Sequence, residues 1–253
     1  MVYTYDKIFL FDLDGTLTEP KRTIHPDHWE FWKELSKNHT LGLVGSSSIN
    51  NIIKQMNVSE EELTSTFAYV FSENGLDGRI NGLPIPKQSL LKFLGEEKYE
   101  NLVNFVLKMF SEIKLPKKRS NFIDLRHGMV NISPIGRNCT YQDREEFMEY
   151  DKKHNIRNMI VNRLREEFQE YGLDYALGGQ ISIDIFPIGW DKRYCLNYLG
   201  NRFSQIYFFG DKTFPGGNDY GIYNDDRTIG HTVTGPIDTI VQVQKIVKSF
   251  YTI

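Results

Sequence analysis

The apolar segment at residues 7–14, which reads KIFLFDLD, constrains the fold of this chain more than any other feature. It has the dense apolar character of a strand that is buried on both faces, as in a parallel β-sheet. Two aspartates, Asp12 and Asp14, end the segment, and Gly15 and Thr16 follow directly. The pattern therefore predicts a buried strand that delivers two carboxylates into one tight turn.

The segments that follow alternate between helix and strand patterns. Residues 25–38 carry apolar side chains at helical spacing, and residues 39–48 (HTLGLVGSSS) form a second apolar strand that ends in small polar residues. Residues 49–57 are expected to form a helix, and residues 67–82 a strand and a turn. This order predicts an α/β fold with a doubly wound, mostly parallel, Rossmann-like sheet that has helices on both faces.

The pattern changes near residues 83–87, where LPIPK places two prolines within three positions. Residues 120–136 (SNFIDLRHGMVNISPIG) then indicate two alternating strands. Residues 151–172 indicate one long helix, and residues 180–189 (QISIDIFPIG) a further strand. Strands that come in pairs around helices favour an antiparallel α+β module.

Buried-strand patterns return towards the end of the chain, at residues 206–211 (IYFFGD) and 231–235 (HTVTG). The simplest arrangement is one domain interrupted by another. We therefore expect a core domain at residues 1–83 and 188–253, and an inserted α+β domain at residues 84–187.

Size, charge and cysteine content exclude several classes of protein. The chain has 253 residues, of which 40% are hydrophobic, so it can bury a large core, and its net charge of −3 gives no support for a nucleic-acid or membrane-surface partner. Cys139 and Cys195 lie far apart without a CxxC pattern, which fits a reducing compartment. The apolar run near the start is shorter than the roughly 20 residues of a membrane span. We expect a cytoplasmic protein.

The two aspartates suit phosphoryl-transfer chemistry. A carboxylate at the carboxyl end of a parallel strand lies where α/β sheets bind their ligands. Beside Mg²⁺, Asp12 can be both a metal ligand and a nucleophile, and Asp14 can act as general acid and base. For a DxDG segment alone, a helix cap or a turn is an equally good interpretation.

Three further segments favour the functional interpretation. A second buried strand ends in Asp211, with Asp219 eight residues later, and Mg²⁺ prefers oxygen ligands of this kind. Ser47 ends another strand with a hydroxyl that could hold a phosphoryl group. Lys192 could neutralise the charge on a transferring phosphate. Two of these residues have a plain alternative when taken singly: a helix cap for Ser47, and a solvated surface residue for Lys192.

In this order, the segments resemble the four motifs of the haloacid dehalogenase superfamily, namely DLDGT, GSSS, the lysine of GWDKRYC, and GDKTFPGGND. The resemblance implies that Asp12 is the nucleophile and Asp14 the general acid/base. It also implies that Ser47 provides a phosphate-binding hydroxyl and that Lys192 neutralises charge. It also implies a Mg²⁺ site with the ligands Asp12, Asp14 and Asp211, and a supporting role for Asp219. The core domain is then the catalytic domain, and the inserted domain is a cap that determines substrate specificity.

A longer resemblance covers nearly the whole chain. The patterns R-x-G-M-x-N-x-S-P-I-G-R, GGQIS-x-D-x-FP-x-GWDKRYCL and FFGDKT-x-PGGND closely resemble the eukaryotic-type α-phosphomannomutases. The resemblance implies that mannose 6-phosphate and mannose 1-phosphate are interconverted in a cytoplasmic homodimer, for GDP-mannose synthesis. It implies a phospho-aspartate intermediate, Mg²⁺, and a sugar 1,6-bisphosphate as intermediate and activator. The substrate-binding residues that it implies are Arg126, Arg137, Arg144, Ser182 and Asp184, and the residues of a further cation site are Tyr223, Asp225 and Thr228.

The sequence departs from the family pattern at two places. Where the family has an arginine shortly after the first motif, this chain has Lys21 followed by Arg22, and either side chain could contact phosphate. A lysine there would lose the bidentate geometry of an arginine. The second motif reads GSSS in place of GGSD; Ser47 keeps the hydroxyl, but a carboxylate is missing.

Two alternatives remain open at this point. A sugar-phosphate phosphatase would use the same core chemistry, with water in place of a sugar as the acceptor. A binding protein without catalysis would need no nucleophile, so the presence of Asp12 argues against this alternative.

The run of basic residues at positions 114–119 (KLPKKR) is interpreted as a solvated surface.

Overall fold

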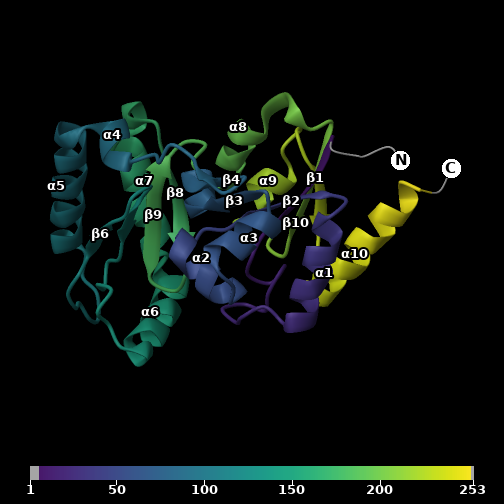
Figure 1. The fold of residues 1–253 in the computed structure, drawn as a ribbon. Helices are drawn as coiled ribbons and strands as arrows, with labels where there is room; N and C mark the ends of the chain where they lie inside the picture. Colours follow the sequence, from purple (N-terminus) through teal and green to yellow (C-terminus); the bar gives the residue numbers. More distant parts are fainter. Residues whose placement is uncertain (1–5, 252–253) are drawn as a thin grey trace. The chain divides into compact units, whose positions relative to one another are not determined.

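A computed structural model describes residues 6–251 (Figure 1). The chain divides into two compact units. Unit 1 comprises the residues up to Lys87 and those from Gly189 onwards, and unit 2 comprises Gln88–Ile188. Within the described residues, no helix combines the length and the apolar character that crossing a membrane requires.

Unit 1 is built on a seven-stranded sheet with the order β11-β10-β1-β2-β3-β4-β5. Its strands are β1 (Lys7–Phe11), β2 (Thr40–Val44), β3 (Tyr69–Ser72), β4 (Asp77–Ile80), β5 (Leu83–Pro84), β10 (Gln205–Gly210) and β11 (Ile229–Thr232). The strands from β11 to β3 are parallel, and β4 and β5 extend the sheet antiparallel. This arrangement confirms the mostly parallel α/β sheet that the sequence predicts.

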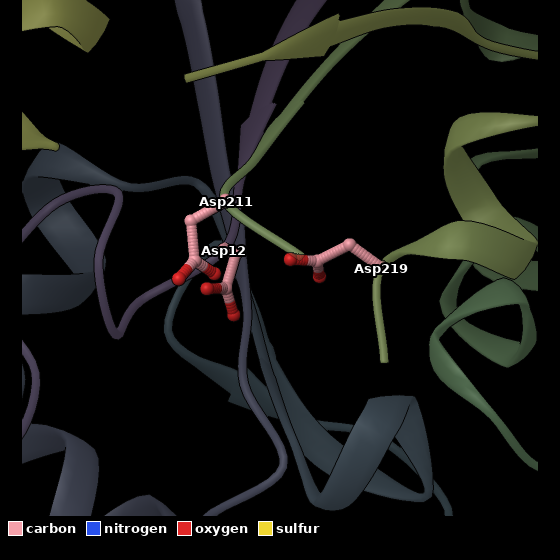
Figure 2. Close-up of side chains that lie close together, drawn as sticks. All are labelled: Asp12, Asp211 and Asp219. Atoms are coloured by element: carbon pink, nitrogen blue, oxygen red, sulfur yellow. The ribbon is translucent and has the colours of Figure 1, made fainter. Parts of the chain in front are cut away.

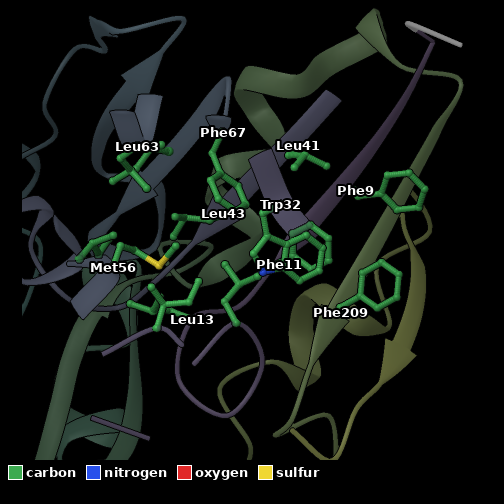
Figure 3. Close-up of a cluster of buried hydrophobic side chains, with 14 of the residues drawn as sticks. Phe9, Phe11, Leu13, Trp32, Leu41, Leu43, Met56, Leu63, Phe67 and Phe209 are labelled. Atoms are coloured by element: carbon green, nitrogen blue, oxygen red, sulfur yellow. The ribbon is translucent and has the colours of Figure 1, made fainter. Parts of the chain in front are cut away.

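Helices cover both faces of this sheet. They are α1 (Pro26–Ser36), α2 (Ile49–Met56), α3 (Glu60–Thr66), α8 (Leu196–Leu199), α9 (Tyr220–Tyr223) and α10 (Pro236–Ser249), with the 3₁₀ turns η1 (Glu73–Gly75), η3 (Lys192–Cys195) and η4 (Gly200–Arg202). In β1, Phe9 and Phe11 pack into a cluster with α1, α2, α3 and α10 (Figure 3). Ile8 and Leu10 point to the opposite face, towards α8 and α9. Burial of alternate residues on both faces explains the continuous apolar run of β1.

The register of the central strands aligns the ends that carry the motifs. Phe11 of β1 lies opposite Phe209 of β10 and Leu43 of β2. Since the strands are parallel, the residues that follow them emerge at the same edge of the sheet. The first, second and fourth motifs therefore meet there, although they lie far apart in the sequence.

Unit 2 contains a four-stranded antiparallel sheet with the order β6-β7-β9-β8, and four α-helices. The strands are β6 (Ile123–Leu125), β7 (Val130–Ile132), β8 (Leu173–Gly178) and β9 (Ser182–Pro187); the helices are α4 (Leu90–Leu94), α5 (Glu96–Glu112), α6 (Tyr141–His154) and α7 (Ile156–Glu167), and a 3₁₀ turn, η2, spans Gln169–Tyr171. Ile132 and Ile183 lie opposite each other and pack into the core of the unit. The next pair, Asn131 and Asp184, projects from the other face. This face is therefore polar.

The prediction of a single long helix at residues 151–172 is wrong. α6 ends at His154 and α7 begins at Ile156, because Asn155 between them adopts a left-handed conformation with φ of 53°. Asparagine tolerates this conformation better than most residues. The helical spacing on the two sides of Asn155 concealed the break.

The basic run at residues 114–119 is also not simply a solvated surface. The carboxylate of Asp143, only 5% exposed, lies 3.1 Å from Lys117 Nζ and 3.1 Å from both Nε and Nη2 of Arg119. Asp143 also completes a capping box with Thr140 at the start of α6. The two basic side chains thus attach the start of α6 to the preceding segment. No sequence pattern linked positions so far apart.

We expect the Asp143→Asn substitution to make stability less dependent on acidic pH. The backbone amide of Thr140 and the side chains of Lys117 and Arg119 lower the pKa of Asp143 to about 2. In the unfolded chain the pKa of an aspartate is about 3.9. The ionised carboxylate of Asp143 therefore stabilises the fold fully at pH values above about 3.9, and this stabilisation is lost as the pH falls through about 2. The difference in urea midpoint between wild type and variant should therefore shrink from pH 4 to pH 2.

The matched control is Glu149→Gln on the same helix, whose side chain is 68% exposed. Exposed ion pairs contribute little to stability. A difference for Asp143→Asn that stays constant from pH 7 to pH 2 would show that the carboxylate charge has no role.

Candidate active site

A cavity of about 70 Å³ lies at the edge of the sheet where β1, β2 and β10 end. Its lining residues are Asp12, Leu13, Asp14, Gly45, Ser46, Ser47, Lys212 and Asn218. The first, second and fourth motifs of the sequence thus contribute to one small site. Lys212 and Asn218 were not identified from the sequence, although both lie within the fourth motif.

Asp12 is held in place by the backbone of the sheet. Its amide donates to the carbonyl of Phe209 at 2.9 Å, which continues the β1–β10 ladder one residue beyond the end of β1. The residue is only 4% exposed. A carboxylate in this position has little freedom to move, as a nucleophile in an in-line transfer requires.

Lys192 is the buried cation of the site. It is 1% exposed, and its ammonium donates to Asp12 Oδ1 and, at 2.5 Å, to Asp219 Oδ1. Burial alone would lower the pKa of Lys192, but the charges of Asp12 and Asp219 outweigh it and raise the pKa. Lys192 therefore stays charged, and the interpretation as a surface lysine is wrong.

The pKa of Asp12 responds to opposing effects. Burial raises it, the ammonium of Lys192 opposes the rise, and the carboxylate of Asp219 adds to it. Lys192 is thus the group that favours the ionised, nucleophilic form of Asp12.

Three carboxylates converge beside this ammonium. Asp12, Asp211 and Asp219 each offer an oxygen within 4.8 Å of the others, and Figure 2 shows their side chains turned towards one another. Asp211 Oδ1 is buried and has no hydrogen-bond partner among residues 6–251. Burial also raises the pKa of Asp211.

This donor set fits a hard divalent cation. Three carboxylates lie beside two ammonium groups, those of Lys192 and of Lys212, whose Nζ is 3.8 Å from Asp211 Oδ2, so negative charge is still in excess. A buried oxygen without a partner is costly unless something binds it. The residues suited to hold a cation are Asp12 and Asp211, with Asp219 close by. Asp14, the other ligand implied by the family resemblance, is not part of this cluster and stays a prediction.

Gly15 is required by the approach of Asp211. Its φ is 79°, and a Cβ atom at this position would lie 2.5 Å from Asp211 Oδ2 and 2.7 Å from its Cγ. A side chain here would displace the carboxylate from the cluster. The glycine after Asp14 therefore serves both the turn and the geometry of the three carboxylates.

Asp14 is fixed through one of its two oxygens. Its Oδ1 accepts from the Lys21 amide and from Gln55 Nε2, both at 2.7 Å. Gln55 also donates to Thr18 Oγ1 at 2.7 Å. Gln55 lies on α2 and was not identified from the sequence, because a neutral side chain 41 positions away carries no signal of this contact.

Lys21 and Arg22 lie in different surroundings. Lys21 has a left-handed φ of 59° and reaches Asp14 through its amide. Arg22 lines a separate cavity of about 790 Å³, together with His25 and His28. The role of either side chain in binding phosphate stays a prediction.

Ser47 lies in the loop between β2 and α2, where it lines the small cavity. Ser48 occupies the N-cap position of α2, and its side chain makes no capping hydrogen bond. The loop therefore presents its hydroxyls beside the first amides of a helix, an arrangement that suits an anion.

The residues predicted for a further cation site lie in the loop around the end of α9. Asp225 is paired with Arg227, which donates to Oδ1 through Nε and to Oδ2 through Nη2, each at 2.7 Å. These hydrogen bonds lower the pKa of Asp225. Thr228 Oγ1 donates to the Ile222 carbonyl at 2.5 Å. A cation bound by Tyr223, Asp225 and Thr228 would compete with Arg227, and this site stays a prediction.

In unit 2, a polar network joins three of the predicted substrate-binding residues. Asp124 Oδ2 lies 3.2 Å from Arg126 Nε and 3.5 Å from Arg137 Nε. Arg137 donates to Asn131 Oδ1, and Asn131 Nδ2 donates to Asp184 Oδ1 at 2.5 Å. Asp124 was not identified from the sequence, although the register of β6 and β7 places it opposite Asn131.

The two other predicted residues lie beside this network. Arg144 Nη2 donates to the Arg137 carbonyl at 3.3 Å. Ser182 is buried, and its hydroxyl donates to the Gly178 carbonyl at 2.7 Å. Unit 2 therefore brings the three arginines together on one polar surface, while Ser182 supports the hairpin of β8 and β9.

Comparison with known proteins agrees with this geometry. The sequence profile of the family described as eukaryotic phosphomannomutase matches residues 28–249. A probable phosphomannomutase of Caenorhabditis elegans is 50% identical over 242 residues, which cover 95% of each chain. A phosphomannomutase of Dendrobium officinale is 52% identical over 235 residues, which cover 93% of this chain and 92% of that protein.

The fold is shared more widely. A haloacid dehalogenase-like hydrolase from Bacteroides thetaiotaomicron superposes with a TM-score of 0.55 at 17% identity, over 86% of this chain and 84% of that one. At this identity the likeness shows a common fold only. The family, by contrast, is shown by the match along nearly the whole sequence: the chain belongs to the eukaryotic phosphomannomutases.

Proposed function

We propose that this protein is a phosphomannomutase that interconverts mannose 6-phosphate and mannose 1-phosphate through a phospho-Asp12 intermediate. The observation that carries the proposal is the buried cluster in which Lys192 bridges Asp12 and Asp219 beside Asp211. A protein that only binds sugar phosphates needs no nucleophile fixed in this way. The family to which the chain belongs supports the choice of hexose phosphates as substrates.

The first half-reaction starts from the phosphorylated enzyme. A hydroxyl of the hexose monophosphate attacks the phosphorus of phospho-Asp12, and its proton passes to Asp14. The bond between phosphorus and the Asp12 oxygen breaks, and its electron pair returns to the Asp12 carboxylate. The product is a sugar 1,6-bisphosphate.

The second half-reaction runs in the opposite direction on the other phosphate. The Asp12 carboxylate attacks that phosphorus, the bond to the sugar oxygen breaks, and Asp14 returns its proton to this oxygen. Lys192 stays charged throughout and stabilises the negative charge of the transferring group. Ser47 and the amides near it hold the phosphoryl oxygens.

Mg²⁺ is part of the proposal, with Asp12 and Asp211 as the residues that hold it and Asp219 beside them. When bound there, the cation neutralises negative charge on the transferring phosphoryl group. The orphaned Oδ1 of Asp211 supports this assignment.

Unit 2 is proposed to act as the specificity domain, in a cytoplasmic homodimer. Arg126, Arg137 and Arg144 suit the binding of the phosphate that is not reacting, because forked guanidinium donors recognise a dianion rather than one face of a sugar. Their proximity within unit 2 supports this role. A phosphatase has no need to bind a second phosphate.

We expect Asp12→Asn to abolish turnover while the protein stays folded, because charge is lost and shape is kept. Asp14→Asn should still form phosphoenzyme from an activated donor, but transfer to a sugar hydroxyl should slow by about 10²–10⁴-fold. The control is Asp27→Asn, whose side chain is 90% exposed. Turnover of Asp12→Asn close to that of the control would exclude Asp12 as the nucleophile.

Removal of divalent cations with EDTA should stop turnover, and added Mg²⁺ should restore it. Asp211→Asn should raise the Mg²⁺ concentration for half-maximal activity by at least about tenfold. Loss of a group that only supports a metal ligand already weakens metal binding by about 10-fold or more, and loss of a ligand itself should weaken it at least as much. Calorimetric titration with Mg²⁺ provides a readout independent of turnover. Full activity in the metal-free protein would rule out this site.

The deciding test is a coupled assay with hexose monophosphate, with and without a sugar 1,6-bisphosphate. We expect the bisphosphate to activate, because an aspartyl phosphate hydrolyses readily and resting enzyme must be primed. Arg144→Ala should strongly reduce mutase turnover but spare the slow hydrolysis of a small aryl phosphate, which has only one phosphate.

Arg163→Ala, at a half-buried arginine of the same unit that is paired with Glu112, serves as the matched control and should leave both rates unchanged. The sugar-phosphate phosphatase is the alternative that this assay separates. If the bisphosphate gives no activation, and free phosphate forms as fast as hexose monophosphate disappears, the protein is a phosphatase.

A further inference from the structure

The turn that follows β3 has an unusual backbone. Glu73, Asn74 and Gly75 form η1, and their φ angles are 48°, 64° and 98°. Three successive residues in the left-handed region are costly when two of them are not glycine, and such strain persists only where the surroundings enforce it. The turn lies at the carboxyl end of β3, next to β2, and Ser47 lies in the loop that follows β2.

This turn is bonded to the loop that contains Ser47. The Glu73 amide donates to the Ser47 carbonyl at 3.0 Å, and the Asn74 amide donates to the Gly45 carbonyl at 2.9 Å. Left-handed backbone directs both amides to the same neighbouring loop. Two hydrogen bonds from the turn therefore fix the backbone of the loop that contains Ser47.

The same turn also touches the segment that carries Lys192. A Cβ atom on Gly75 would lie 2.7 Å from the backbone nitrogen of Cys195 and 2.8 Å from its Cα. Cys195 is buried and ends η3, the single 3₁₀ turn that Lys192 begins. Because the nearest atoms are backbone, a side chain at position 75 can be accommodated only if η3 or the turn moves.

We propose that the turn formed by Glu73, Asn74 and Gly75 sets the distance between Ser47 and Lys192, and that Gly75 is a positioning residue for phosphoryl transfer. The roles of Ser47 and Lys192 rest on the proposed function. Misplacement of a catalytic group by about 1 Å can reduce a rate by about 10²-fold. A rigid three-residue turn in contact with both segments prevents such movement.

The test compares Gly75→Ala with Gly82→Ala. Gly82 has a similar φ of 77°, but its added Cβ would meet only Thr64 Oγ1 at 3.7 Å. Both variants place a side chain at a positive φ, so both should lower the melting temperature, and Gly75→Ala should lower it more because its Cβ also meets the backbone of Cys195. Only Gly75→Ala should also lower kcat, by about 10- to 100-fold well below its melting temperature, with a smaller change in KM.

Two further readouts do not depend on mutase activity. The first is the phosphorylation of Asp12 by acetyl phosphate in the Mg²⁺-loaded protein, which we expect to occur in the wild type and to slow in Gly75→Ala only. Hydrogen exchange of the Glu73 and Asn74 amides should accelerate in the same variant. If wild type forms phosphoenzyme but does not isomerise hexose phosphates, the proposed function fails while the positioning role is still tested.

The proposal is overturned if Gly75→Ala and Gly82→Ala lose the same fraction of kcat and of phosphorylation rate, or if amide exchange in the turn is unchanged. Should Gly75→Ala fail to fold, Asn74→Ala replaces it, with Asn81→Ala as the control. Asn81 has a φ of 50° in the turn between β4 and β5, away from the site. Equal activity of these two variants would likewise overturn the proposal.

Discussion

The buried ion pair between Lys192 and two carboxylates is the interaction on which the rest of unit 1 depends. Charges in a protein interior are tolerated only when partners compensate them, and removal of one partner from such a pair costs about 3–5 kcal/mol. Asp12 follows β1, Asp219 follows β10, and Lys192 lies on η3, so the ion pair ties three separate segments together. The parallel strands of the sheet bring those segments to one edge, where the ion pair can form.

The residues at the ends of strands were the ones that the sequence could predict. Asp12, Ser47 and Asp211 each follow an apolar run, and parallel strands must place such residues at a common edge. Gln55 could not be found in this way, because its contact with Asp14 depends on how α2 lies on the sheet. Local patterns report which residues an element presents, but not which distant partner each one meets.

Unit 2 shows the same limit in its helices and charges. The apolar spacing of α6 and α7 predicted helix correctly on both sides of Asn155, but spacing alone does not reveal a single left-handed residue. Lys117 and Arg119 looked like surface charge until the fold placed the buried Asp143 between them. A basic run is solvated by default, and only tertiary structure can supply a buried acid as its partner.

The hydrogen bonds to Asp14 have a stereochemical consequence. Since the Lys21 amide and Gln55 both donate to Oδ1, the proton that Asp14 exchanges in the proposed mechanism is carried by Oδ2, whose position is fixed. In a mutase, the hydroxyls at the two ends of a hexose must each visit that point in turn. In the proposed reaction, a stationary proton donor thus obliges the sugar to move: the bisphosphate has to turn end over end, so that each of its two ends reaches Asp14 Oδ2.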